Sequence, residues 1–180
     1  MQMNQAGDLQ IAAGQWLQDV PWQLFATLEF PSARVRFETA HSKLHEMLHT
    51  VEHSLRTRVG CVYAAETRSK SGAIVPLHFH AALTALRPIE YQLVMGAWGE
   101  GRANSVQDLA RVKPYDPSRG GIEYIMKQIT DHDCQWGLKD VELFSNSMPK
   151  PHMGARANRR WLDQLRSQPH AGAGDRYISL

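Results

Sequence analysis

The chain has 180 residues and a mass of 20.3 kDa, and 43% of its residues are hydrophobic, which suits one domain with a buried core. No stretch reaches the ~20 apolar residues that a membrane helix needs. Residues 1–10 are polar and lack the pattern of a signal peptide, so we expect a cytoplasmic protein that contacts no membrane. The net charge of +2 neither requires nor excludes nucleic acid. Cys61 and Cys134 lie too far apart in sequence for a zinc knuckle.

Hydrophobic periodicity predicts a mixture of strands and helices. In chain order these are a strand over 22–30, a helix over 36–58, strands over 61–67 and 75–85, a helix over 89–98, a strand over 106–113, a helix over 122–130, a strand over 141–144 and a helix over 156–165. The polar turn 68–72 would join the strands 61–67 and 75–85 as a hairpin. Strict strand–helix–strand alternation is absent, so we expect an α+β fold, a central antiparallel sheet of about five strands with helices packed on it.

The composition predicts one folded unit with loose ends. Residues 1–20 are rich in glutamine and small side chains and form the expected lead-in, residues 21–168 form the single domain, and residues 169–180 form a flexible tail. No internal repeat is visible, and no helicase domain is expected.

The segment from Leu77 to Ala81 carries the strongest chemical signal. Successive side chains of a strand point to opposite faces, so His78 and His80 share one face, about 7 Å apart, and Phe79 points toward the core. The hairpin would bring Glu66 beside them. Two imidazoles and one carboxylate, with open positions for substrate, form a recognised catalytic site for divalent metals. The alternative is a pair of histidines on a half-exposed strand that binds no ion.

Tyr124 and Lys127 form the second signal. They lie one turn apart on the predicted helix 122–130, and therefore on the same side of it. A lysine there can stabilise phenolate character and hold a phosphate, which makes Tyr124 a candidate nucleophile. The alternative is a tyrosine at the edge of the core beside a solvated lysine. Tyr115, just before a turn rich in proline and glycine, is the rival nucleophile.

In this order along residues 22–144, the motifs together resemble the HUH endonucleases, and they look most like the single-tyrosine initiators of rolling-circle replication. FATLEF, residues 25–30, resembles the first motif of that family, His78-Phe79-His80 resembles the second, and Tyr124-x-x-Lys127 resembles the third. Conjugative relaxases of this superfamily place the tyrosine ahead of the histidines, whereas here it follows them.

The resemblance implies a site-specific nickase of single-stranded DNA that forms a 5′-phosphotyrosine and leaves a 3′-hydroxyl to prime replication of a plasmid or phage. Tyr124 and Lys127 would be catalytic, and Glu66, His78 and His80 would hold Mn²⁺ or Mg²⁺. The fold would have the topology of the HUH initiators, which resembles that of RNA-recognition domains. The expected partners are unpaired origin or hairpin DNA and, because no GxxxxGK[ST] motif is present, a host helicase acting in trans.

Two other functions remain open. A single-strand transposase would use the same chemistry on the end of a mobile element. A non-catalytic module that binds single-stranded nucleic acid would use aromatic side chains on the sheet to stack bases, and would need neither Tyr124 nor a divalent ion.

Further residues are candidate nucleic-acid contacts. These are Thr27 in the first motif and the basic cluster Arg156, Arg159 and Arg160, which could instead be an ordinary charged surface. Histidines also recur every four residues on the helix 36–58, at His41, His45, His49 and His53. We interpret them as a solvated or DNA-facing stripe, with an adventitious metal site as the alternative.

Overall fold

The structure is a computed structural model, and it describes residues 16–30, 35–68, 72–99, 110–130 and 134–145. Five strands form one antiparallel sheet: β1 (Leu24–Glu29), β2 (Val59–Arg68), β3 (Ile74–Ala85), β4 (Ala110–Pro114) and β5 (Gln135–Lys139), in the order β4-β1-β3-β2-β5. The predicted α+β class, with an antiparallel sheet and helices packed on it, is confirmed. No helix among the described residues is long and apolar enough to span a membrane.

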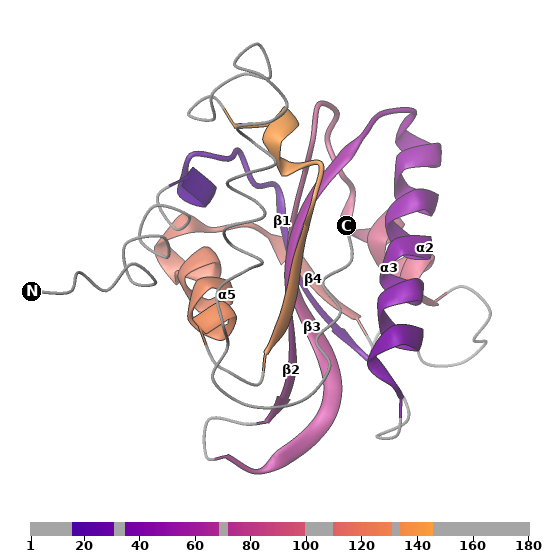
Figure 1. Cartoon of the computed structure of the whole chain (residues 1–180). Coiled ribbons are helices and arrows are strands. Elements are labelled where there is room, and N and C mark those ends of the chain that lie inside the picture. The colour runs from indigo at the N-terminus through magenta and orange to yellow at the C-terminus, as the bar shows by residue number, and fades with distance from the viewer. Residues whose placement is uncertain (1–15, 31–34, 69–71, 100–109, 131–133, 146–180) are drawn as a thin grey trace, which may run out of the picture.

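Helices cover both faces of the sheet (Figure 1). The helices α2 (Phe37–Leu55) and α3 (Tyr91–Gly99) pack on one face, and α5 (Gly121–Thr130) lies on the other. Successive side chains of β3 point to opposite faces of the sheet. Leu77, Phe79 and Ala81 are buried in the core under α2 and α3. His78 and His80 point to the face covered by α5. The predicted inward orientation of Phe79 is therefore confirmed.

The fifth strand lies earlier in the chain than we expected. The segment 141–144, predicted as a strand, contains the short 3-10 helix η2 (Val141–Leu143), and β5 precedes it. Asp140 ends β5 with a left-handed backbone, φ 53°, and the i, i+3 spacing of Val141 and Phe144 lets both side chains pack into the core beside α5. Gly137 and the polar ends of β5 hide its strand character in the sequence.

The other predicted elements are present with small shifts of their ends. β4 begins at Ala110, α3 begins at Tyr91, and the predicted turn 115–121 includes the 3-10 helix η1 (Pro117–Arg119). The predicted lead-in (1–20) lies mostly, and the tail (169–180) and the helix 156–165 entirely, outside the described residues.

Two glycines set the position of α5 over the sheet. Gly120 adopts a left-handed conformation, φ 62°, after η1, which glycine reaches without steric cost. Gly121 lies so close to β1 that a β-carbon there would be 2.9 Å from the ring of Phe25. The pair therefore lets the first turn of α5 lie directly on the sheet face that carries His78 and His80.

Candidate metal centre

Glu66, His78 and His80 come together as the sequence predicts. Glu66 of β2 is paired with His78 of β3, and His80 follows two residues later on the same face. One ligand atom from each residue lies within 4.8 Å of the other two, so this group could hold a metal ion. A register shift, of the kind that a β-bulge produces, follows Glu66 in β2, and such irregularities often lie beside functional sites because they redirect side chains.

The hydrogen bond made by His78 fixes which of its nitrogens faces the group. Its Nδ1 lies 2.9 Å from the carbonyl oxygen of Pro76, and a carbonyl only accepts, so Nδ1 carries the proton. The Nε2 atom is then the nitrogen that faces the group, and it lies 3.4 Å from Glu66 Oε2. This is the arrangement of a metal-ligating histidine, whose second nitrogen donates to a carbonyl or carboxylate.

His80 is held from both neighbouring strands. Its Nε2 lies 3.1 Å from Glu66 Oε2, a carboxylate oxygen that only accepts, so Nε2 carries the proton and Nδ1 accepts from the Thr27 hydroxyl 3.3 Å away. A metal ion bound by Nε2 would displace this proton. Burial, and then the neighbouring His78, lower the pKa of His80 against the opposing effect of Glu66. A neutral imidazole is the form that binds a metal. Thr27 therefore has a positioning role in this structure, and its predicted contact with DNA stays a prediction.

The donor set fits a divalent cation. Two imidazole nitrogens and one carboxylate oxygen converge within 4.8 Å of one another, and the carboxylate contributes negative charge. The side chains are only 18% exposed at His78 and 13% at His80, while Glu66 is buried. A buried carboxylate is stabilised by a positive partner. Among the described residues, this trio is the one set of three or more His, Cys, Asp and Glu side chains close enough together to hold an ion.

Tyr124 contacts this group directly. Its hydroxyl donates a hydrogen bond of 2.7 Å to Glu66 Oε2, and its ring packs edge-on against His80, with the centroids 4.8 Å apart. Both contacts follow from the position of α5, because Tyr124 lies on the first turn of that helix, after Gly121. Lys127, one turn further along α5, is exposed.

The rival tyrosines are placed less favourably. Tyr63 of β2 is buried on the opposite face, under α2. Tyr115 follows β4 and is half-buried beside Gly121, and burial, followed by Glu123, raises its pKa. Tyr91 is exposed at the start of α3. Among the tyrosines in the described ranges, Tyr124 is the one whose hydroxyl contacts the candidate metal ligands.

Sequence reasoning missed two basic side chains beside the site. Arg111 and Lys113 of β4 are exposed and pair with Thr27 and Phe25 of β1, so they lie on the α5 face, two strands from His80 and its neighbours. The alternation of β4 could have placed them on one face, but the sequence does not tell which strand β4 joins. The predicted contacts Arg156, Arg159 and Arg160 lie outside the described residues.

The histidine stripe on α2 divides into two halves. His49 and His53 are exposed, as a solvated stripe would be, whereas His41 and His45 are half-buried: His41 contacts Tyr63, and His45 contacts His41. Full exposure to solvent therefore holds for the second half of the stripe only, and its contact with DNA stays a prediction.

Comparison of the chain with protein-family models, with curated proteins and with solved structures found no significant match.

Proposed function

We propose that this chain is a metal-dependent nickase of single-stranded DNA, with the chemistry of the HUH replication initiators and Tyr124 as the nucleophile. The observation that carries the proposal is the 2.7 Å hydrogen bond from the Tyr124 hydroxyl to Glu66 Oε2. It joins a candidate nucleophile to a candidate metal ligand, although the two residues are 58 positions apart in the chain.

The residues of this chain supply the parts that strand cleavage needs. The Tyr124 oxygen would attack the phosphorus of a phosphodiester, forming a P–O bond to the tyrosine and breaking the bond to the 3′ oxygen. The Tyr124 proton, which points at Glu66 Oε2 in the free protein, would pass to solvent once that oxygen holds the ion, and the departing 3′ oxygen would take a proton from solvent. Lys127, one helical turn away, would balance the charge on the phosphate or the phenolate. The 5′-phosphotyrosine keeps the bond energy available for religation.

Glu66, His78 and His80 would hold the ion. A divalent metal at this position supplies Lewis acidity toward a non-bridging phosphate oxygen and a template for in-line attack. The mixed nitrogen and oxygen donors suit Mn²⁺ somewhat better than Mg²⁺, which prefers oxygen ligands throughout.

The substrate we propose is unpaired DNA, of the kind that an origin or an extruded hairpin presents. A phosphate must be splayed away from a duplex to reach Tyr124, which is half-buried against the sheet. The exposed Lys113 on the same sheet face, with Arg111 if DNA displaces its 3.7 Å ion pair with Glu29, would provide positive charge that binds the neighbouring phosphates without reading sequence. The 3′-hydroxyl released by cleavage would then be available to prime rolling-circle replication.

The test is a covalent-adduct assay with a mixed pool of single-stranded DNA labelled at its 3′ end. The 3′-terminal fragment keeps the label and would remain on the protein through its 5′ phosphate. We expect a labelled protein band on a denaturing gel in the presence of Mn²⁺, none with a chelator, and none with Tyr124→Phe. Tyr115→Phe is the matched control and should form the adduct.

An adduct that persists in Tyr124→Phe would assign the nucleophile elsewhere. No adduct with the wild-type chain, across a diverse pool and several divalent ions, would leave a binding module as the better account. DNA affinity that depends on neither Tyr124 nor a metal would favour that same reading.

A further inference from the structure

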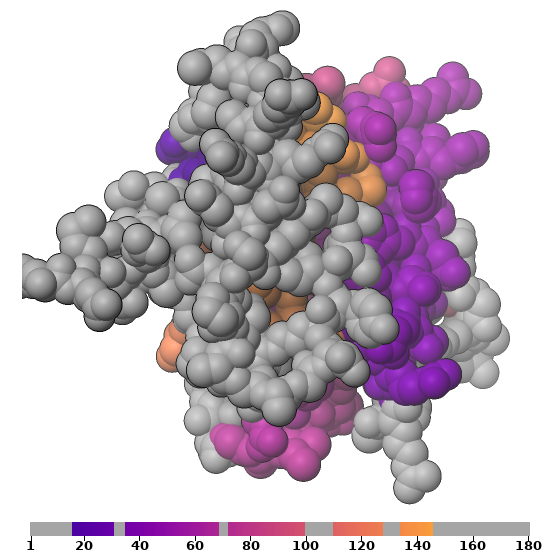
Figure 2. Space-filling model, viewed as in Figure 1, coloured from indigo at the N-terminus to yellow at the C-terminus, as the bar shows by residue number. Residues whose placement is uncertain are grey.

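A second group of ligand-type atoms lies on the face of the sheet opposite the candidate metal centre. His41 and His45 stand one turn apart on α2, and their Nε2 atoms are 3.2 Å apart. The hydroxyl of Tyr63 from β2 lies 2.7 Å from His41 Nε2. Figure 2 shows α2 along the right side of the molecule, so the helix that carries this pair lies at the surface.

Hydrogen bonds alone do not explain why three polar atoms lie so close together. An imidazole nitrogen has either one proton or one in-plane lone pair, yet His41 Nε2 faces both the Tyr63 oxygen and His45 Nε2 at hydrogen-bonding distance. Burial, and then the neighbouring His45, lower the pKa of His41, and burial followed by Lys139 lowers that of His45. Both rings are therefore neutral near pH 7 and have lone pairs to offer.

The spacing matches that of two nitrogen ligands on one ion. Zinc–nitrogen bonds are about 2.0–2.1 Å long, so two imidazoles in a tetrahedral site have nitrogens roughly 3.3–3.4 Å apart. The observed 3.2 Å between the two Nε2 atoms is close to this value. Histidines four residues apart on a helix are a common way to reach it.

The third atom is held in place by packing. Tyr63 is paired with Gly137 of β5, and a β-carbon at position 137 would overlap the tyrosine hydroxyl. Glycine thus lets the phenol cross the edge strand toward α2. The other side of the Tyr63 ring packs edge-on against Phe79, with the centroids 5.6 Å apart. The packing on both sides keeps the hydroxyl beside His41.

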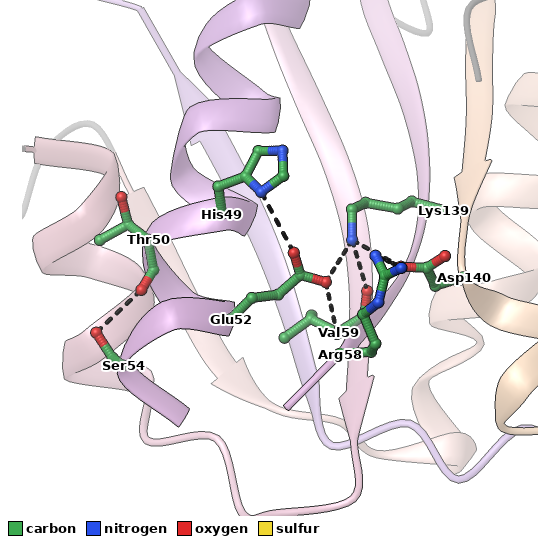
Figure 3. A network of polar contacts seen from close by, with 8 residues as sticks. All are labelled: His49, Thr50, Glu52, Ser54, Arg58, Val59, Lys139 and Asp140. Atoms are coloured by element: carbon green, nitrogen blue, oxygen red, sulfur yellow. Dashed lines mark hydrogen bonds and ion pairs between the residues drawn. The ribbon is translucent and has the colours of Figure 1, made fainter. Parts of the chain in front are cut away.

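The charges around the pair are balanced. Lys139 is the nearby cation that acts on His45, and its ammonium group is bonded to the carboxylates of Glu52 and Asp140 (Figure 3). Glu52 also accepts a hydrogen bond from the backbone of Val59. This network ties the last turns of α2 to β2 and β5, which holds the helix and its histidines against the sheet before any ion arrives.

We propose that His41 and His45, with the Tyr63 oxygen as a third and weaker donor, form a second metal site for Zn²⁺ or a similar nitrogen-preferring ion. Like the candidate centre at Glu66 it offers two imidazoles and one oxygen, but its oxygen belongs to a phenol and not to a carboxylate; Zn²⁺ should enter both sites, whereas Mn²⁺ and Mg²⁺ should prefer the carboxylate. An ion there would link α2 to β2 and so stabilise the fold. The inference does not depend on nickase activity.

The test is the number of Zn²⁺ ions bound by the metal-stripped full chain, measured by equilibrium dialysis, with Co²⁺ absorbance as a second readout. We expect two ions for the wild type, one for His45→Ala, and two for His53→Ala, the matched control with an exposed histidine on the same helix. Tyr63→Phe should weaken the second site about tenfold, as the loss of a supporting contact does. Circular dichroism checks that each variant is folded. If His45→Ala is not folded, Tyr63→Phe tests the site instead, because phenylalanine keeps the ring and its packing.

The variants also separate this site from the candidate metal centre. Glu66→Gln should lose one ion and keep the ion that His45→Ala removes. If the wild type binds one ion that Glu66→Gln abolishes and His45→Ala leaves unchanged, the second site is refuted and the proposed function is untouched. If His53→Ala weakens binding as much as His45→Ala does, the histidines of α2 bind ions without a defined site, and the proposal is refuted.

Discussion

Replacing Thr27 by valine tests whether this residue positions a metal ligand or contacts DNA. Valine has the same shape but no hydroxyl, so His80 Nδ1 loses its 3.3 Å partner while the packing is kept. Removing a supporting contact of this kind usually lowers metal affinity by about 10–100-fold. Because 3.3 Å is beyond the usual range of a hydrogen bond, we expect the lower end, about tenfold or about 1.4 kcal/mol.

The assay is isothermal titration of the DNA-free protein with Mn²⁺. Thr27→Ser keeps the hydroxyl and should bind Mn²⁺ like the wild type. If Thr27→Val binds Mn²⁺ with unchanged affinity but binds single-stranded DNA more weakly, the positioning role is wrong, and the contact with DNA predicted from the sequence is the better explanation.

The burial of Glu66 and Cys61 and the space around two glycines lead to four further predictions. Glu66→Gln keeps the shape of the side chain but removes its charge, so Mn²⁺ binding at this site, measured by titration, should fall below detection while the circular dichroism spectrum is unchanged. Gly121→Ala places a β-carbon 2.9 Å from the ring of Phe25 and should destabilise the protein by about 1–3 kcal/mol in urea unfolding and reduce nicking. Gly96→Ala, on α3 with open space around it, should instead stabilise by about 0.5–1 kcal/mol, and equal effects of the two changes would contradict the account. Burial raises the pKa of Cys61 to about 12, so its thiol should resist alkylation at about pH 8 until the protein unfolds, and rapid labelling of the native protein would show that β2 opens readily.

The candidate metal centre could be predicted because strand geometry is simple. Alternation along β3 places His78 and His80 on one face whatever the rest of the chain does, and a hairpin must bring the end of β2 beside them. The contact between Tyr124 and Glu66 is harder to predict from the sequence, because it depends on how α5 crosses the sheet. The close packing of Gly121 against Phe25 sets that crossing.

What could not be predicted depends on tertiary neighbours. The short strand β5 forms because β2 offers it an edge, and its Gly137 is there to accommodate Tyr63, so its own sequence has little strand character. The same glycine brings the Tyr63 hydroxyl to His41, which periodicity alone assigned to a solvated stripe. The first motif predicts Thr27 as a contact with nucleic acid, whereas its 3.3 Å distance to His80 Nδ1 gives it a supporting role that no local pattern encodes.

The most direct test of the central claim is to locate the covalent adduct. The wild-type protein is allowed to react with single-stranded DNA and Mn²⁺, digested with nuclease and trypsin, and examined by mass spectrometry. Cleavage after Arg119 and Lys127 releases the peptide 120–127, which contains Tyr124 as its one tyrosine, while Tyr115 falls in the preceding peptide. We predict a nucleotide attached through its 5′ phosphate to Tyr124. A nucleotide on the peptide that contains Tyr115, or on any other residue, would contradict the assignment of Tyr124 as the nucleophile.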